Sequence, residues 1–274
     1  KEIIHKNEEL EKLERVKSEF ISIVSHELRT PLTPIKNALS ILASGRCGHL
    51  EENAMKFVDM AKRNVENLTN IINDILDINK IEAGKMDFNY KLMNIHSVIE
   101  NVRANFDCVA KEHEIIFSTQ EQDNLPDIYA DSQRLGQVLT NLVSNAIKFT
   151  PKGKNITIKS ELKNSNDIYK NPHFEHELKS LDGNYIVVSV VDEGIGIKDS
   201  DLLKAFDKFT QIENSLSRKV GGTGLGLPIA KQLIKAHKGT IWCDSEENKG
   251  SSFHFALPVS TESIEGKTIQ KELL

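Results

Sequence analysis

The side chains best suited to chemistry in the first part of the sequence are His26 and its neighbour Glu27. On a helix, residues 26, 30, 33 and 37 share one face, and here all four are polar while the apolar residues lie opposite. We therefore predict that His26 faces solvent. Glu27 can accept a proton from one imidazole nitrogen, which leaves the other nitrogen as a nucleophile. A surface histidine without a chemical role is the alternative interpretation.

Thr30 follows His26 by one helical turn and lies on the same face. A zinc protease site is excluded here, because the second histidine of such a motif would have to stand at position 30. Pro31 and Pro34 cannot donate hydrogen bonds to the carbonyl groups of Glu27 and Thr30. We expect a kink or a local loosening of the helix at this point.

A second polar cluster consists of Asn141, Asn145 and Lys148, whose spacing places them on one face of a helix. Amide oxygens suit a hard cation that keeps most of its waters, such as Mg²⁺. The lysine offers a point charge for a phosphate group. Two asparagines and a lysine on a helix surface are common, so this cluster gains its meaning from the residues downstream.

Two glycine-rich turns lie downstream of this cluster. Asp192 ends a strand-like segment and is followed by Gly194 and Gly196, and a second turn, residues 221–226, opens a helix. Free backbone N–H groups and the dipole at a helix start favour phosphate. A dinucleotide-binding fold is rejected, because a loop rather than a strand precedes this second turn and it lies late in the chain.

Two long helices must position His26. Apolar residues three or four apart form one stripe from Val24 to Leu42, and a second stripe lies within a helix expected from Asn53 to Ile81. Residues 3–20 are rich in Glu and Lys with near-heptad apolar spacing, which predicts a coiled-coil lead-in. Residues 83–85 form a helix stop. Since each helix carries one apolar face, a four-helix bundle made by two chains is the simplest way to bury both.

The rest of the chain mixes strands and helices without regular alternation, which favours an α+β sandwich. Helices are predicted at 95–110, 131–149 and 225–237, and strands at 115–117, 156–158, 185–191, 240–242 and 252–257. The polar stretch 162–184 is expected to extend a hairpin. Its His173 and His176 lack a third ligand nearby, so a metal site there is disfavoured.

Composition excludes several classes of protein. The hydrophobic content of 39%, the charged content of 27% and the net charge of −5 describe a globular protein without the basic excess expected of a nucleic-acid binder. Cys47, Cys108 and Cys243 lack metal-ligand spacing and indicate reduced thiols and a cytoplasmic location. No apolar run is long enough to span a bilayer. Because the sequence starts inside a charged helical pattern, we expect any sensor or membrane anchor to precede Lys1.

In order and spacing, four segments resemble the H, N, G1 and G2 boxes of sensor histidine kinases: residues 25–31, 141–149, 192–197 and 221–227. The resemblance covers about residues 10–260. It implies a coiled-coil linker (1–18), a dimerisation and histidine phosphotransfer domain (19–86), a catalytic ATP-binding domain (94–260) and a tail (261–274). The expected fold is an all-α helical hairpin that forms a dimeric four-helix bundle, followed by an α+β sandwich of the Bergerat type.

The resemblance also implies roles for individual residues. His26 is the expected phosphoacceptor, Glu27 its acid/base partner, and Thr30 either orients a water that attacks a phosphoaspartate or is a plain surface hydroxyl. Asn145 is the expected Mg²⁺ ligand, and Asp192 accepts from the adenine amine. The expected ATP-binding residues are Asn141, Asn145, Lys148, Phe149, Asp192, Gly194, Gly196, Ile197, Phe209, Arg218, Lys219, Gly222, Thr223, Gly224, Leu225 and Gly226. Phe206 and Phe209 match the F box, and packing in the core is an equal alternative for both; residues 210–220 match the mobile lid.

The implied function is ATP-dependent phosphorylation of His26, followed by transfer to an aspartate of a response regulator receiver domain, with ATP and Mg²⁺ as cofactors and a homodimer as the active form. Regulator phosphatase activity is a further option. Two other functions compete: an ATP-driven conformational machine of the same ATPase superfamily, and a non-catalytic signalling scaffold. The machines use a glutamate where this chain has Asn141, and an asparagine cannot act as that base. The intact His26–Glu27 pair argues against a scaffold.

Overall fold

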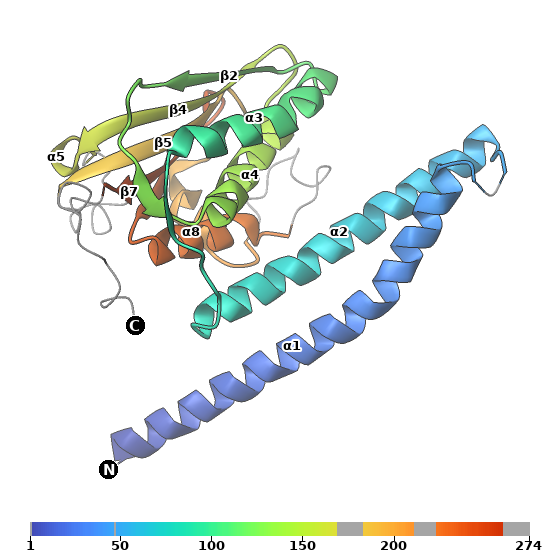
Figure 1. The fold of residues 1–274 in the computed structure, drawn as a ribbon, viewed down its shortest axis with the longest axis horizontal. Coiled ribbons are helices and arrows are strands. Elements are labelled where there is room, and N and C mark those ends of the chain that lie inside the picture. Colours follow the sequence, from blue (N-terminus) through green and yellow to red (C-terminus); the bar gives the residue numbers. More distant parts are fainter. Residues whose placement is uncertain (1, 47, 169–182, 211–222, 260–274) are drawn as a thin grey trace. The chain divides into compact units, whose positions relative to one another are not determined.

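The chain divides into two compact units, Lys1–Asp87 and Phe88–Leu274. The computed structural model describes residues 2–46, 48–168, 183–210 and 223–259 (Figure 1). No helix among these residues is both long and apolar enough to cross a membrane. Residues 88–93 lie between the two domains expected from the sequence, and in the structure they belong to the second unit.

The first unit is a hairpin of two antiparallel helices, α1 (Glu2–Ala43) and α2 (Glu52–Glu82) (Figure 1). Residues 2–18 continue directly into the rest of α1. Pro31 and Pro34 lie inside this helix without ending it, and Figure 1 shows that α1 bends in its C-terminal half. Helix α2 ends at the predicted stop, where Gly84 takes a left-handed φ of 63°.

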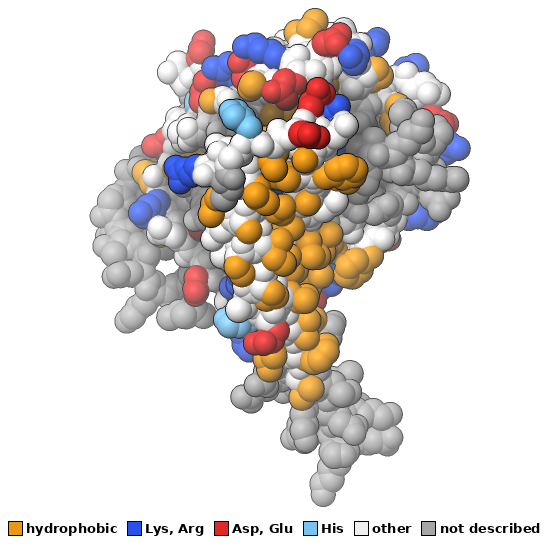
Figure 2. All heavy atoms as spheres, turned by 90° about the vertical axis from the view of Figure 1, so that its right-hand side faces the viewer, with side chains coloured by type: hydrophobic (Ala, Val, Ile, Leu, Met, Phe, Trp, Pro, Cys, Tyr) orange, Lys and Arg blue, Asp and Glu red, His pale blue; other side chains and the backbone are white. Residues whose placement is uncertain are grey.

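The hairpin leaves much of its apolar stripe exposed. Phe20 on α1 and Phe57 on α2 are each 66% exposed. Figure 2 shows hydrophobic side chains gathered in a band that runs down the middle of this face. Among the hairpin residues whose side chains are described, the exposed large hydrophobic ones are Val16, Phe20, Ile23, Val24, Leu28, Ile35, Ile41, Phe57, Met60 and Leu68. A patch of this extent is unusual on a protein that has no partner for it.

The second unit contains a five-stranded sheet in the order β2-β4-β5-β7-β6. The strands are β2 (Ile116–Glu121), β4 (Asn155–Asn164), β5 (Asn184–Asp192), β6 (Thr240–Glu246) and β7 (Gly250–Pro258). Strands β2 and β4 are parallel and the other neighbours are antiparallel. A second, two-stranded sheet pairs β1 (Lys91–Met93) with β3 (Ile128–Ala130). This arrangement confirms the expected α+β class.

Helices α3 (Ile95–Glu112), α4 (Ser132–Phe149) and α8 (Gly226–Ala236) lie on one side of the large sheet (Figure 1). The core between them is apolar: Leu135, Leu139 and Leu142 of α4 are fully buried. Three short helices are also present among the described residues of this unit, namely α5 (Ser165–Ile168), η2 (Asp199–Asp201) and η3 (Leu203–Phe206). The predicted hairpin extension is present where Asn164 pairs with Asn184, while His173 and His176 lie outside the described residues.

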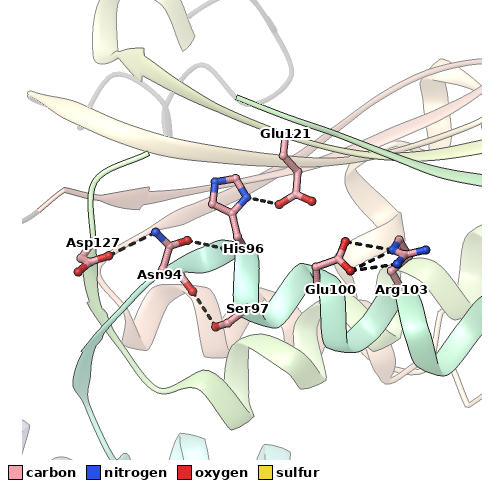
Figure 3. A network of polar contacts seen from close by, with 7 residues as sticks. All are labelled: Asn94, His96, Ser97, Glu100, Arg103, Glu121 and Asp127. Carbon is pink, nitrogen blue, oxygen red and sulfur yellow. Dashed lines mark hydrogen bonds and ion pairs between the residues drawn. The ribbon is translucent and has the colours of Figure 1, made fainter. Parts of the chain in front are cut away.

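Polar contacts fix the start of α3, as Figure 3 shows. The Asn94 side chain accepts a hydrogen bond from the backbone N–H of His96 at 2.9 Å and so caps the helix. The His96 ring contacts the carboxylate of Glu121 at the end of β2. This pair ties the first turn of α3 to the edge strand of the sheet.

Candidate active site

His26 is presented to solvent, as its position on α1 predicts. Its side chain is 75% exposed and that of Glu27 is 76% exposed. The His26 Nδ1 lies 3.6 Å from Glu27 Oε1, which is close but longer than a hydrogen bond. A small rotation of either side chain would bring the carboxylate into contact with Nδ1 and leave Nε2 open to solvent.

The backbone around His26 is held by side chains of its own helix. Thr30 Oγ1 donates to the carbonyl oxygen of His26 at 3.0 Å, and Thr33 Oγ1 donates to that of Arg29 at 3.1 Å. The Arg29 guanidinium donates to Asn73 Oδ1 at 2.9 Å and so links α1 to α2. His26 is therefore exposed but sits on a braced segment.

Hydrogen bonds at the start of α4 set the position of its polar face. Asp131 caps the helix by accepting from the backbone N–H groups of Gln133 and Arg134, and it also accepts from that of Asn89. Burial favours a higher pKa for Asp131, but these three donors hold it below its usual range. Burial lowers the pKa of His237, whose Nε2 accepts from the Asp131 N–H at 3.0 Å.

Helix α4 carries four of the predicted site residues. Asn141, Asn145 and Phe149 are half-buried, and Lys148 is exposed. The Asn141 Nδ2 donates to the carbonyl oxygen of Gly226 at 3.1 Å, where α8 begins. A Cβ at Gly226 would lie 3.5 Å from Asn141 Cγ, an ordinary van der Waals contact, so this approach does not itself require glycine.

Asp192 is a buried carboxylate at the end of β5, only 6% exposed. Its Oδ1 accepts from the backbone N–H of Gly194 at 2.8 Å and from that of Ser251 at 3.2 Å. Burial raises the pKa of Asp192 to about 6. A carboxylate with two donors on one oxygen is well oriented and keeps its other oxygen for a further donor.

Gly194 and Gly196, which follow Asp192, are needed because backbone carbonyl groups of other segments lie where a side chain would be. A Cβ on Gly194 would lie 2.7 Å from the carbonyl oxygen of Phe149. Gly196 has a φ of 67°, and a Cβ there would lie 2.0 Å from the carbonyl oxygen of Glu246. The lack of a side chain at these two positions thus lets the turn lie against the end of α4 and against strand β6.

The second glycine turn is held at its base by Phe209. The Phe209 N–H donates to the carbonyl oxygen of Gly224 at 3.1 Å, and both residues have positive φ. Thr223 Oγ1 accepts from the N–H of Leu225 at 3.0 Å, just before α8. Arg218, Lys219 and Gly222 lie outside the described residues.

The two phenylalanines of the expected F box differ. Phe206 is buried and packs edge-to-face against Phe253, with 6.4 Å between ring centroids. Phe209 is 69% exposed. The core interpretation therefore holds for Phe206 and is wrong for Phe209.

Helix α4 connects the two glycine turns. Asn141 contacts the start of α8, and the carbonyl of Phe149 accepts from the N–H of Ile195 at 3.3 Å, in the turn after β5. The two contact points are eight residues apart, which is about 12 Å along a helix. Asn145 and Lys148 lie on the same stretch of helix. Contacts at the two ends of this stretch of α4 therefore join it to both glycine turns, through Gly226 and through Ile195.

The contacts that the β6–β7 hairpin makes with Asp192 and the turn after it were not predicted from the sequence. Ser251 supplies an N–H to Asp192, and Ser245 accepts from the N–H of Ile197 at 2.8 Å. Gly250 has a φ of 116°, and a Cβ there would lie 2.0 Å from the carbonyl oxygen of Asp192. A glycine followed by two serines at the start of the closing strand was the available signal.

Comparisons with known proteins agree with this arrangement. Residues 16–84 match the family model of the His Kinase A (phospho-acceptor) domain. Residues 130–261 match that of the histidine kinase-, DNA gyrase B- and HSP90-like ATPase.

Individual relatives extend over most of the chain. It is 34% identical to the sensor histidine kinase WalK of Bacillus subtilis (strain 168), over 95% of this chain and 39% of that protein. It is 36% identical to the sensor histidine kinase GacS of Pseudomonas protegens, over 89% of this chain and 25% of that protein. The chain thus spans less than half the length of these curated relatives.

A solved structure gives the same result for the fold. The crystal structure of full-length ShkA in complex with AMPPNP superimposes with a TM-score of 0.68 and 25% identity, over 88% of this chain and 45% of that one. The two family models match consecutive parts of the chain in the same order as the helical hairpin and the α+β unit. The chain therefore belongs to the sensor histidine kinase family, with a phospho-acceptor hairpin followed by an ATPase domain.

Proposed function

We propose that this chain transfers the γ-phosphoryl group of ATP to His26 and then to an aspartate of a response regulator receiver domain. The observation that carries the proposal is His26 itself, exposed beside Glu27 on a braced helix within a phospho-acceptor domain. The second unit supplies the matching nucleotide site around α4. Phosphoryl transfer of this kind needs positioning and neutralisation of charge more than covalent help from other residues.

In the first step, the His26 Nε2 lone pair attacks the γ-phosphorus, the bond from that phosphorus to the bridging oxygen breaks, and ADP leaves with its electron pair. The ring gains positive charge as the P–N bond forms, and Glu27 accepts the Nδ1 proton. In the second step, Glu27 returns the proton to Nδ1, and an aspartate oxygen of the receiver domain attacks the phosphorus. The P–N bond breaks, neutral imidazole leaves with its electron pair, and His26 is regenerated.

The nucleotide is held by residues of the second unit. Asp192 accepts from the adenine amine with the oxygen that does not bind Gly194 and Ser251, while Lys148 lies at the phosphates. Asn145 fits Mg²⁺, because it is half-buried, uncharged and on the same helical face as Asn141. When bound with ATP, the ion reduces the negative charge on the phosphates.

Other residues complete the nucleotide site in this proposal. Phe149, Gly194, Gly196 and Ile197 line the base side, and Phe209, Arg218, Lys219, Gly222, Thr223, Gly224, Leu225 and Gly226 line the phosphate side. The start of α8 offers backbone N–H groups to the phosphates.

Two chains form the active unit in this proposal. The support is the exposed apolar stripe of the hairpin, which includes Phe20 and Phe57. Four helices from two chains would bury it. Sedimentation of the chain at micromolar concentration checks the dimer, and a stable monomer would contradict it.

An ATP-driven conformational machine is not supported. The Asn141 amide donates to Gly226 and has no lone pair basic enough to activate water. We place the reaction in the cytoplasm, where ATP and reduced thiols such as Cys108 and Cys243 belong. Fractionation of cells that express the parent protein tests this location.

Replacing Asn145 by alanine is expected to lower ATP-dependent phosphorylation by at least about tenfold, because the magnesium ligand is lost. The hairpin is untouched, so the dimer should persist. Phosphorylation is measured with labelled ATP over a range of Mg²⁺ concentrations. The Asn145→Ala defect should diminish at high Mg²⁺, and a defect that ignores Mg²⁺ would remove this residue from the metal site.

Replacing Thr30 by alanine is expected to lower the phosphatase activity while leaving the kinase activity nearly unchanged. The Thr30 hydroxyl donates to the His26 carbonyl, which leaves its oxygen able to hold a water near a docked phosphoaspartate. Autophosphorylation of Thr30→Ala should stay within about threefold, or about 0.7 kcal/mol. Dephosphorylation of the regulator should fall at least about tenfold, or about 1.4 kcal/mol. Equal losses in both activities would mean that Thr30 only supports the helix.

A further inference from the structure

The turn after Asp192 is clamped by the β6–β7 hairpin. The backbone N–H of Asn248 donates to the carbonyl oxygen of Ile195 at 2.7 Å. Gly196 approaches the Glu246 carbonyl so closely that no side chain would fit between them. Both contacts link residues of the turn to the loop end of the hairpin. The hairpin therefore packs directly against the turn that follows Asp192.

Ser245 is the side chain at the centre of this clamp. Its Oγ accepts from the backbone N–H of Ile197 at 2.8 Å and donates to the carbonyl oxygen of Gly250 at 2.8 Å. The same oxygen lies 3.0 Å from Ser251 Oγ. One half-buried hydroxyl thus joins the end of the Asp192 turn to the start of β7.

The start of β7 acts directly on Asp192. Ser251 donates its N–H to Asp192 Oδ1, and Gly250 lies against the Asp192 carbonyl oxygen. The other donor to Oδ1 is Gly194, which belongs to the turn. Ser245 is therefore bonded to both segments that orient this carboxylate, although it does not contact the carboxylate itself.

We propose that Ser245 is a positioning residue for adenine recognition: its hydroxyl holds the turn and β7 at the spacing that aims the free oxygen of Asp192 at the base. This inference rests on the proposed function, because it assumes that Asp192 meets the adenine amine. Guanine carries a carbonyl oxygen at that place, which a carboxylate repels. Loss of Ser245 should consequently reduce the preference for ATP over GTP.

The preference for ATP is expected to depend on Ser245 because several polar groups bind its one hydroxyl. Ser245→Ala leaves the Ile197 N–H and the Gly250 carbonyl without this partner, and polar groups that are partly buried seek new ones. The turn and β7 can then shift independently, and Asp192 loses its fixed direction. We expect ATP to bind about tenfold more weakly while GTP binding changes less than about twofold.

The test measures binding of Mg–ATP and Mg–GTP by calorimetry, together with KM and kcat for autophosphorylation. Ser245→Ala should raise KM for ATP about tenfold and leave kcat within about twofold, since a binding interaction is lost. Ser245→Thr keeps the hydroxyl and should restore the ATP preference. Ser118→Ala is the matched control, because it breaks a sheet hydrogen bond to Thr157 Oγ1 (3.1 Å) between β2 and β4, strands that lack these contacts with the hairpin.

Stability and selectivity must be separated. Thermal melts of all variants show which of them are destabilised. Ser118→Ala should lower stability without changing the ATP preference. If Ser245→Ala fails to fold, Ser245→Cys replaces it, because a thiol of similar shape accepts hydrogen bonds poorly. In an Asp192→Asn background, Ser245→Ala should cause no further loss of selectivity, since coupled residues are not additive.

The outcomes separate this inference from the function on which it rests. A parent chain that binds no ATP overturns both. A parent that prefers ATP, with a Ser245→Ala variant that keeps this preference or weakens ATP and GTP equally, overturns the role of Ser245 alone. A parallel loss of selectivity in Ser245→Ala and Asp192→Asn, with rescue by Ser245→Thr, supports it.

Discussion

Replacing His26 by glutamine is expected to abolish ATP-dependent phosphorylation, with a loss of more than about a thousandfold, or about 4 kcal/mol. Glutamine is polar and tolerates the exposed helix face, but its amide nitrogen has no nucleophilic lone pair. ATP affinity should change less than about twofold, because the proposed nucleotide residues belong to the second unit. Labelled ATP and calorimetry on one preparation measure both quantities.

A second exposed histidine of the same hairpin provides the control. His49→Gln removes an imidazole from the loop between α1 and α2 and should leave phosphorylation unchanged. Persistent acid-labile labelling of His26→Gln would contradict the assignment. Loss of labelling in both variants would point to damage of the hairpin rather than to loss of the nucleophile.

The second large effect is expected for Asp192→Asn. Asparagine can still accept from the Gly194 and Ser251 N–H groups with its oxygen, so the fold should persist. Its amide nitrogen would then face the adenine amine, and a donor would meet a donor. We expect ATP to bind about a hundredfold more weakly, or about 2.8 kcal/mol. Calorimetry with ATP and GTP measures this, and equal binding of both nucleotides to parent and variant would remove Asp192 from the base site.

The raised pKa of Asp192 gives this prediction a pH dependence. The pKa of about 6 lies above the ordinary value of 3.8, so the folded chain binds more protons than the unfolded chain between these values. Stability from this group therefore falls as pH rises through that window, and Asp192→Asn should flatten the fall. ATP affinity should instead weaken as the pH falls below 6, because the Asp192 carboxyl gains a proton and can no longer accept from the adenine amine in the same way. Unfolding and binding curves across this range check both signs.

Periodic apolar patterns predicted the long elements well. Helices α1, α2, α4 and α8 lie within a residue or two of their expected bounds, because each has a continuous apolar face. Strands β1 and β3 were missed, since three residues carry no readable period. Strand β4 was predicted too short, because its polar second half is stabilised by pairing with β5 rather than by its own composition.

The site was predictable where residue type and spacing decide the position. The exposure of His26 follows from its helix face, and the burial of Asp192 follows from the apolar strand before it. Contacts that depend on strand register were not predictable: Ser245 and Ser251 reach the Asp192 turn only because β6 and β7 pair as they do. The Arg29–Asn73 bond likewise depends on how α1 and α2 are aligned.

The most direct measurement locates the phosphate itself. The chain is incubated with Mg–ATP, digested near neutral pH so that phosphohistidine survives, and its peptides are analysed by mass spectrometry. We expect one modified residue, His26, with a phosphate that is lost in acid and kept in base. Phosphate on another side chain, an acid-stable phosphoester, or no incorporation by a chain that binds ATP would contradict it.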